Sequence, residues 1–260
     1  MGAHPDDCEW MAAGLAIRCA RAGWTVRFVS VTNGDAGHHE MRRAALAARR
    51  EVEARRAAAV IGATAGTIGE HDGRLFVDDR TTGKVVSAIR SFDPDVLVAH
   101  RMNEYHRDHR YAAQLVLDAS FVLQVPLVYP RAVAVRRVPL ILYACDFFTE
   151  GTPFRADILF DITADLGTRT RMLIAHESQF REWIPWLNGE RRAGRRHPVT
   201  DTARIARDLE HRPREIARRY AAELKRRYGR RVEAAEAFMV SEYGRREIDG
   251  SLAKLIEGRR

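Results

Sequence analysis

The sequence predicts an α/β fold: a Rossmann-like, mostly parallel sheet with helices on both faces, plus a helical C-terminal extension. Two observations support this prediction. Through the first half of the chain, apolar segments of strand length alternate with segments of helical length, and this alternation is typical of βαβ units. Polar stretches rich in glycine, aspartate and histidine separate them, as expected for loops. Hydrophobic residues make up 46% of the 260 residues, which is enough for the core of one large domain.

The individual elements follow from segment length, periodicity and stop signals. We expect helices over residues 9–23, 40–62, 82–92, 111–124, 165–180 and 200–228. We expect strands over residues 25–32, 64–69, 93–100, 140–144 and 157–163, the third of them after a turn. In the helix over 40–62, an apolar stripe is expected to pack inward through Met41, Ala45, Ala48, Val52 and Ala59.

The chain is expected to divide into a catalytic α/β domain over residues 1–185 and an arginine-rich, mainly helical extension over 186–260 that packs on it. A parallel sheet of this type needs a strand that runs into the opening motif "GAHPDD". Only Met1 to Ala3 precede that motif. We therefore expect either a first strand that is nearly absent or a native start that lies further upstream.

Charge and composition narrow the class of partner. The net charge is +8, and arginines cluster over residues 191–197 and 204–231. Acidic residues are interspersed in the second cluster at Asp208, Glu210, Glu215 and Glu223, which favours a solvated helix face over a nucleic-acid footprint. A non-enzymatic protein that binds an anionic partner through these helices remains the alternative.

No run of eighteen apolar residues appears, and the first residues have no secretory pattern, so we expect no membrane partner. The three cysteines are odd in number and form no metal-type pair. They are typical of reduced thiols, and we expect a cytoplasmic protein.

Polar residues follow three of the expected strands, in "HPDD", "TNGDAGHH" and "HRMNEYHRDHR". Ligands of open parallel sheets collect at the carboxyl ends of the strands, so these stretches are expected to meet at one edge. Together they supply His4, Asp6, Asp7, Asp35, His38, His39, His100, His106, Asp108 and His109. Such a concentration of imidazole and carboxylate groups predicts a metal site.

Catalytic zinc usually takes three protein ligands and leaves one position for water. His4 and Asp7 are three residues apart, which suits a turn that enters a helix, and "HRDH" would complete the set. Asp6 would then take a proton from the metal-bound water. Taken alone, "HPDD" also fits a proline turn with an N-cap, and "HRDH" fits a solvated loop. Cys8 is interpreted as a small buried residue rather than a ligand.

From Gly2 to about Phe180, the motifs "GAHPDD", "TNGDAG", "HRDH" and "HESQ" occur in an order that resembles the LmbE-like, or PIG-L, family of zinc-dependent N-deacetylases. The resemblance implies a Rossmann-like fold with a single zinc ion. It implies that the metal ligands are His4, Asp7 and His109. It also implies that Asp6 is the general base, that His106 stabilises the oxyanion or protonates the leaving nitrogen, and that Asp108 orients His106.

The same resemblance implies hydrolysis of an acyl group, usually acetyl, from a small N-acylated amino sugar. An amidase that acts on thiol-cofactor or antibiotic conjugates is the alternative within enzymes. Substrate contacts are assigned to Asp35, His38, Arg43 and Arg74. Trp183 and Trp186 are expected either to stack on a sugar or to pack the C-terminal part. The sequence leaves open whether the protein is a homo-oligomer. Arg107 stands where many family members have proline.

Overall fold

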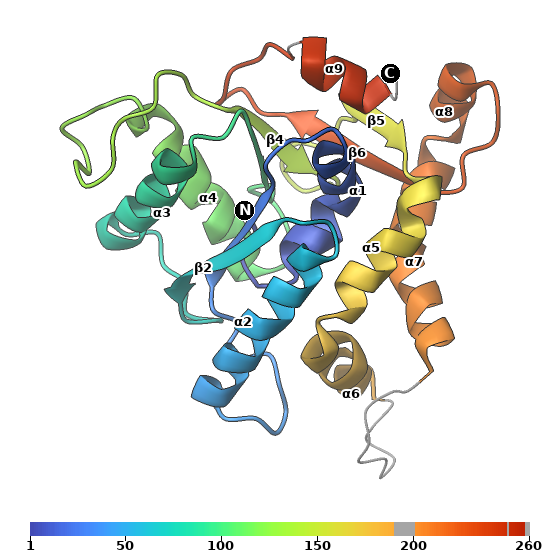
Figure 1. Cartoon of the computed structure of the whole chain (residues 1–260), viewed down its shortest axis with the longest axis horizontal. Helices are drawn as coiled ribbons and strands as arrows, with labels where there is room; N and C mark the ends of the chain where they lie inside the picture. The colour runs from blue at the N-terminus through green and yellow to red at the C-terminus, as the bar shows by residue number, and fades with distance from the viewer. Residues whose placement is uncertain (190–200, 249, 258–260) are drawn as a thin grey trace.

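The computed structural model describes residues 1–189, 201–248 and 250–257, and it shows a mixed α/β fold (Figure 1). The predicted arginine cluster over 191–197 lies entirely outside these residues. Strands pair in two sheets, with the orders β1-β2 and β3-β4-β6-β5. The α/β class is confirmed, but the prediction of a mostly parallel sheet is not, because β6 runs antiparallel to both of its neighbours.

The first half of the chain follows the βαβ pattern. In order along the chain, it forms α1 (Asp7–Arg21), β1 (Arg27–Thr32), α2 (Arg43–Ala59), β2 (Thr64–Glu70), α3 (Asp79–Phe92), β3 (Val96–Ala99) and α4 (Arg107–Val122). β1 and β2 are parallel, and so are β3 and β4. The structure differs most from prediction at α4, which begins four residues early, inside the motif "HRDH", because His106 caps it. This start places His109 on the first turn of a helix rather than in a loop.

The segment before the first helix lies between β1 and β3. The Gly2 amide donates to Val29 O at 2.9 Å, and Val31 N donates to Gly2 O at 2.9 Å. On the other side, the Met1 amino group donates to Val98 O at 2.6 Å. Gly2 forms only an isolated parallel bridge, with Ser30, so the expectation of a nearly absent first strand matches what residues 1–3 show. This segment delivers His4 to the carboxyl ends of the parallel strands.

The later half of the chain is antiparallel and more irregular. It contains β4 (Leu140–Ala144), β5 (Ile158–Asp161), a 3₁₀ turn (Thr163–Asp165), α5 (Leu166–Ile174), a π-helix η2 (Ser178–Trp183), α6 (Ile184–Leu187), α7 (Thr202–Arg219), α8 (Ala221–Tyr228), β6 (Ala235–Val240) and α9 (Gly250–Glu257). In Figure 1, α5 and α7 lie along one side of the molecule, with α3 and α4 on the other. β6 lies between β4 and β5, so a segment expected to be mainly helical also supplies a central strand.

The buried face of α2 differs from the predicted stripe. Ala45, Ala48, Val52 and Ala59 are exposed, whereas the buried positions are Leu46, Arg50, Glu53, Ala57 and Ala58. The prediction from apolar residues chose the wrong face of the helix, because the face that is buried contains two charged residues, each with a partner. Arg50 contacts Asp6, and Glu53 accepts hydrogen bonds from the amide and hydroxyl of Ser178.

The core contains apolar clusters on both sides of the strands, one with α3 and α4 and another with α1. One buried guanidinium, that of Arg90 on α3, ties down the irregular chain after α4. It donates to six backbone carbonyls, those of Val122, Leu123, Val125, Val128, Tyr129 and Ala132. Of the helices described, none is both long and apolar enough to span a bilayer.

Candidate active site

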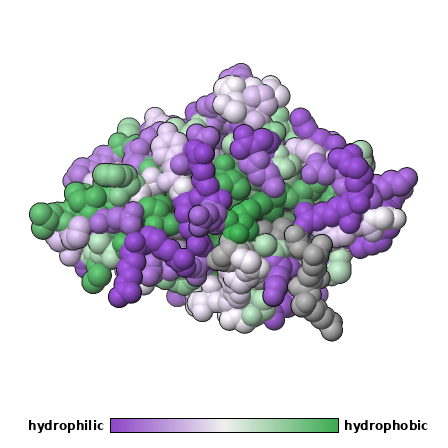
Figure 2. All heavy atoms as spheres, turned by 90° about the horizontal axis from the view of Figure 1, so that it is seen from above, coloured by the Kyte–Doolittle hydropathy of each residue, from purple (hydrophilic) through white to green (hydrophobic). Residues whose placement is uncertain are grey.

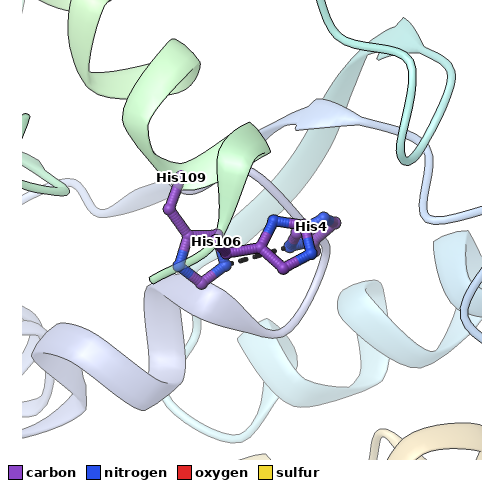
Figure 3. A group of neighbouring side chains, drawn as sticks. All are labelled: His4, His106 and His109. Atoms are coloured by element: carbon purple, nitrogen blue, oxygen red, sulfur yellow. Dashed lines mark hydrogen bonds between the residues drawn. The ribbon is translucent and has the colours of Figure 1, made fainter. Parts of the chain in front are cut away.

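Three histidines meet where the N-terminal segment reaches the start of α4. His4 follows the Met1–Ala3 segment, while His106 and His109 come from the N-cap and first turn of α4 (Figure 3). They line a cavity of about 590 Å³ together with Asp6 and Asp7. That volume lies within the range of small-molecule sites.

Donor atoms of His4, Asp7 and His109 lie within 3.2–3.4 Å of one another. His4 Nδ1 lies 3.3 Å from Asp7 Oδ2, and His109 Nε2 lies 3.2 Å from His4 Nδ1 and 3.4 Å from Asp7 Oδ1. Tetrahedral bonds of about 2.0–2.1 Å to zinc separate two ligand atoms by roughly 3.3–3.4 Å. The three side chains named by the family resemblance therefore fit a tetrahedral metal ion. Three neighbouring donor sets share these residues: His4 with His106 and His109, Asp7 with His100 and His109, and His4 with Asp72 and Asp108.

Both imidazoles, those of His4 and His109, have a carboxylate next to the ring nitrogen that faces away from Asp7. His4 Nε2 lies 3.3 Å from Asp72 Oδ1 and 3.6 Å from Asp108 Oδ2, and His109 Nδ1 lies 2.9 Å from Glu104 Oε2. Metal-binding histidines usually have such a partner, which fixes the tautomer and the ring orientation. The arrangement leaves Nδ1 of His4 and Nε2 of His109 facing each other and Asp7.

The electrostatics of this cluster favour a cation. Burial lowers the pKa of His4, but hydrogen bonds to Asp108, Asp7 and Asp72 outweigh burial and hold that pKa well above its usual value. Burial likewise opposes the ionisation of Asp7, yet the charges of His109 and His100 hold its pKa well below the usual value. A bound metal ion would interact with the same carboxylates that otherwise stabilise a protonated imidazole.

Asp6 reaches the cavity beside the proposed ligand Asp7. Its Oδ1 accepts a hydrogen bond from Arg50 Nη2 at 2.6 Å. Arg50 is buried, donates also to Gly34 O, and lies 3.8 Å from Asp72 Oδ2. A charge-assisted contact of this kind holds the carboxylate in one orientation. Gly34 has a φ of +68°, and a Cβ there would meet the Arg50 guanidinium at 2.6–2.7 Å, so the glycine allows Arg50 its position.

His106 is oriented by the backbone of α4. Its Nδ1 accepts the Asp108 amide at 3.1 Å, which leaves the proton of the neutral ring on Nε2. Burial and the neighbouring His4 and His109 lower the pKa of His106, which favours the neutral ring. The Asp108 side chain takes a different position from the one expected of it: its Oδ2 accepts the Gly73 amide at 2.7 Å and faces His4 rather than the His106 ring. The His106 ring is thus oriented by the backbone amide of Asp108 rather than by its carboxylate.

The four residues assigned to substrate contact do not line the cavity. Asp35 is buried and holds Arg43, His71 and the Asp72 amide, at 3.0, 2.7 and 3.0 Å. His38 bonds to Glu182 at 2.9 Å, and Arg74 is exposed on the loop after β2. Asp35 and Arg43 support the loop that carries Asp72, so in this structure the four residues lie outside the cavity wall and their contact with a substrate stays a prediction.

Several wall residues had no role in the sequence prediction. They include Arg50, Asp72, Arg101, Glu104, Tyr105, Asp146, Gln179 and Arg212. Asp72 follows the second strand, so the strand-end rule that selected the other residues also applied to it. Arg212 lies on α7, far along the chain, where no local pattern points to a site. Trp183 lines the cavity, whereas Trp186 stacks on Trp183 and His39 at centroid distances of 5.2 and 5.0 Å.

Comparison with known proteins supports the resemblance. Residues 1–120 match the family described as PIG-L, GlcNAc-PI de-N-acetylase. This part of the chain is a PIG-L family domain. The whole described fold extends beyond that match, into the antiparallel half.

Among curated relatives, a 4-oxalmesaconate hydratase from Pseudomonas putida is 26% identical over 173 residues. That alignment covers 63% of this chain and 66% of the hydratase. Among solved structures, the 4-carboxy-2-hydroxymuconate hydratase GalB of Pseudomonas putida has a TM-score of 0.73 at 18% identity, covering 95% of this chain and 96% of GalB. The N,N'-diacetylchitobiose deacetylase of Pyrococcus horikoshii has a TM-score of 0.72 at 18% identity, covering 93% and 82%. The fold is therefore shared by enzymes of two reaction classes.

Proposed function

We propose that the protein is a zinc-dependent hydrolase that removes an acyl group, in the first instance acetyl, from an N-acylated amino sugar or a related conjugate. The observation that carries the proposal is the arrangement of His4, Asp7 and His109, whose donor atoms lie 3.2–3.4 Å apart beside Asp6 and His106. The description of the matched family, a de-N-acetylase, supports the same reaction class.

Each proposed role follows from a position in the cavity. His4, Asp7 and His109 would hold Zn²⁺, which when bound supplies the Lewis acidity that polarises a carbonyl and acidifies water. Asp6, held by Arg50, accepts the proton of the attacking water. His106 donates its Nε2–H to the developing oxyanion, because its Nδ1 is already an acceptor. The proton on Asp6 then passes to the leaving nitrogen.

The test is acetate release from a panel of N-acetylated amino sugars, with thiol-cofactor and glycopeptide antibiotic conjugates included. We expect release by the zinc-loaded protein, loss of release after chelation, and recovery when Zn²⁺ is added. A protein that binds one zinc ion tightly and cleaves no member of the panel would contradict the deacetylase proposal.

Hydration of an unsaturated carboxylate is the second candidate. It is favoured by the identity with the oxalmesaconate hydratase and by three guanidinium groups in the cavity wall, those of Arg50, Arg101 and Arg212. Arginine binds carboxylates in a planar, two-point geometry. In this reaction Asp6 would deprotonate the water that adds to a carbon–carbon double bond.

The two candidates differ in a direct measurement. Hydration of a conjugated carboxylate removes its ultraviolet absorbance without releasing acetate. Deacetylation releases acetate and a free amine. Arg212→Leu sharpens the distinction: a carboxylate substrate is expected to lose affinity by about 10–100-fold, since a charge-assisted contact contributes about 1.5–3 kcal/mol, whereas a neutral sugar loses little.

A further inference from the structure

Arg212 of α7 is the one arginine of the active-site cavity wall that has no carboxylate partner among the described residues. Hydrophilic residues cover much of the outer face shown in Figure 2, whereas Arg212 lines the cavity. Arg50 is paired with Asp6, and Arg101 is paired with Asp146. Arg212 bonds only through Nη2, to a backbone carbonyl, so in the part of the chain that the structure describes its Nε and Nη1 donors have no acceptor. These donors are available to a ligand.

The guanidinium of Arg212 lies where β4 ends. Its Nη2 donates to the carbonyl oxygen of Cys145, which directly follows β4 and also lines the cavity. β4 is the parallel neighbour of β3, and neighbouring strands lie about 4.8 Å apart. His100 directly follows β3 and lies 3.2 Å from Asp7 Oδ2. Arg212 and the proposed metal ligands therefore lie at the ends of neighbouring strands, close enough to contact one small substrate.

The surroundings of Arg212 carry an excess of positive charge. Two guanidinium groups lie beside the Trp10 ring, that of Arg169 at 5.4 Å and that of Arg212 at 5.8 Å from its centroid. Arg169 is buried and donates to the backbone oxygens of Leu209 and Trp10 rather than to a carboxylate. Burial lowers the pKa of Arg169 to about 10 against the charge of Glu236, and the positive charge of Arg212 acts in the same direction as burial. An anion bound beside Arg212 would stabilise both guanidinium groups.

One carboxylate of the wall, that of Asp146, follows Cys145 directly and limits the charge of a ligand. Its Oδ1 accepts hydrogen bonds from Arg101 Nη1 at 2.8 Å and from the Phe148 amide at 2.9 Å. Asp146 therefore has its own cation and leaves Arg212 free. Its negative charge still repels a phosphate ester, which carries about −1.5 to −2 charges near pH 7, more than it repels a singly charged carboxylate.

We propose that Arg212 forms a carboxylate-binding subsite, and that the substrate is an N-acylated amino sugar or conjugate that carries a carboxylate. A guanidinium binds this group through two parallel N–H···O bonds. The proposal rests on the proposed function, because it places the acyl group at His4, Asp7 and His109. Arg212 would determine which substrate binds and would take no part in the reaction.

The experiment compares ligands that differ only in charge. N-acetylmuramic acid carries its carboxylate on O3 of the ring, and the uronic acid of N-acetylglucosamine carries it at C6; the methyl ester of each is the neutral control. Binding is measured by calorimetry in the zinc-loaded Asp6→Asn protein, which is not expected to turn the ligands over. We expect at least one acid to bind about 10–100-fold more tightly than its ester.

Variants at position 212 test whether this preference depends on the guanidinium. Arg212→Leu should abolish the preference and leave the affinity for the ester nearly unchanged. Arg212→Gln keeps an N–H donor for Cys145 O and should lose the preference too, which separates ligand binding from the contact between α7 and β4. Arg214→Leu is the matched control on the same helix, since Arg214 pairs with Glu210 and Glu233 outside the cavity wall, and it should keep the preference.

Equal affinity for both acids and their esters, or a preference that survives in Arg212→Leu and Arg212→Gln, would overturn the proposal. Tighter binding of N-acetylglucosamine 6-phosphate than of either acid would overturn the choice of a carboxylate. Acetate release by the parent protein separates this proposal from the proposed function. An Arg212-dependent preference without release from any ligand supports the subsite and contradicts the deacetylase. Release from neutral sugars alone, unchanged in Arg212→Leu, does the reverse.

Discussion

The half of the molecule before β4 and the half that begins with β4 contribute different groups to the same cavity. The first half is parallel, and it supplies His4, Asp6, Asp7, His106 and His109 from strand-end loops and helix starts. The second half is antiparallel around β6 and supplies walls, among them the aromatic and basic side chains of η2 and α7. The PIG-L match covers the first half and stops near α4. We infer that the reaction belongs to the first half and the choice of substrate to the second.

The largest effect is expected when a proposed ligand is removed from the first half. His109→Ala deletes one of three donors, so zinc affinity should fall by more than ~100-fold, beyond the loss typical of a supporting residue. Metal content after dialysis against a graded chelator measures this. His211→Ala, an exposed histidine on α7, is the matched control and should keep its zinc. Parental zinc affinity in His109→Ala would remove the residue from the ligand set.

Asp6→Asn should affect the rate and leave the metal in place. Asparagine keeps an oxygen for Arg50 but cannot accept a proton, and general-base assistance contributes about 10²–10⁴-fold to a rate. We expect kcat to fall in that range with zinc content unchanged, and Asp7→Asn to lose zinc instead. If the two variants show the reverse pattern, the roles of Asp6 and Asp7 are exchanged.

Glu104→Gln should weaken the metal site without destroying it. Its carboxylate lies 2.9 Å from His109 Nδ1, and replacing such a supporting group typically costs 10–100-fold in metal affinity. Competition with a chromogenic chelator gives the number. Glu70→Gln, on β2 and paired with Arg80 and Lys84, serves as the control. Equal affinities for the two variants would show that Glu104 does not support His109.

Trp183→Ala tests the contribution of the second half of the molecule to substrate binding. Trp183 lines the cavity from η2, and an aromatic contact contributes about 0.5–1.5 kcal/mol, equivalent to ~2–10-fold. We expect KM to rise by that factor with kcat nearly constant, and Trp186→Ala to have a smaller effect. A loss confined to kcat would place Trp183 in the reaction rather than in substrate binding.

The smallest effect is expected from two arginines of α7 that lie outside the cavity wall, Arg214 and Arg218. Arg214 pairs with Glu210 and Glu233, and Arg218 pairs with Glu215. Both of these arginines therefore have an acidic neighbour, and we expect only weak association of the protein with duplex DNA at physiological salt. Binding measured across a salt series checks this. Tight binding whose affinity falls steeply with salt would instead indicate phosphate contacts.

How well the sequence predicted each region depended on how local the determining contacts are. Strands and helices of the first half were predicted within a few residues, because βαβ units follow from the spacing of apolar segments. β6 was missed because its pairing with β4 and β5 joins segments some 70–100 residues apart, which local periodicity does not record. The predicted helix over 165–180 breaks after Ile174, where Ser178 bonds to Glu53 of α2.

The residues of the site also differ in how well the sequence predicted them. The residues proposed to bind the metal lie together in the structure, and their position after expected strand ends in the chain was enough to predict this. Arg50 was missed because it lies on a helix face that looks solvated by composition, and only its contact with Asp6 explains its burial. Asp35 was assigned to substrate because it shares a strand-end loop, yet its oxygens face His71 and the Asp72 amide. Position along the chain identified the loop and did not determine which way each side chain points.

Arg90 has a consequence for how this fold tolerates change. Six peptide carbonyls of the chain from Val122 to Ala132, groups that every amino acid possesses, accept hydrogen bonds from Arg90. Two side chains add contacts of their own, since Leu123 is buried in the core and the Tyr129 hydroxyl donates to Asp79. The other, exposed positions of this stretch are therefore free to vary so long as the carbonyls keep their places, whereas position 90 is not. The backbone path of about ten residues therefore depends on Arg90, which lies more than thirty positions earlier in the chain. In homologues we expect the exposed residues of this loop to vary, its backbone conformation to stay the same, and arginine to be constant at position 90.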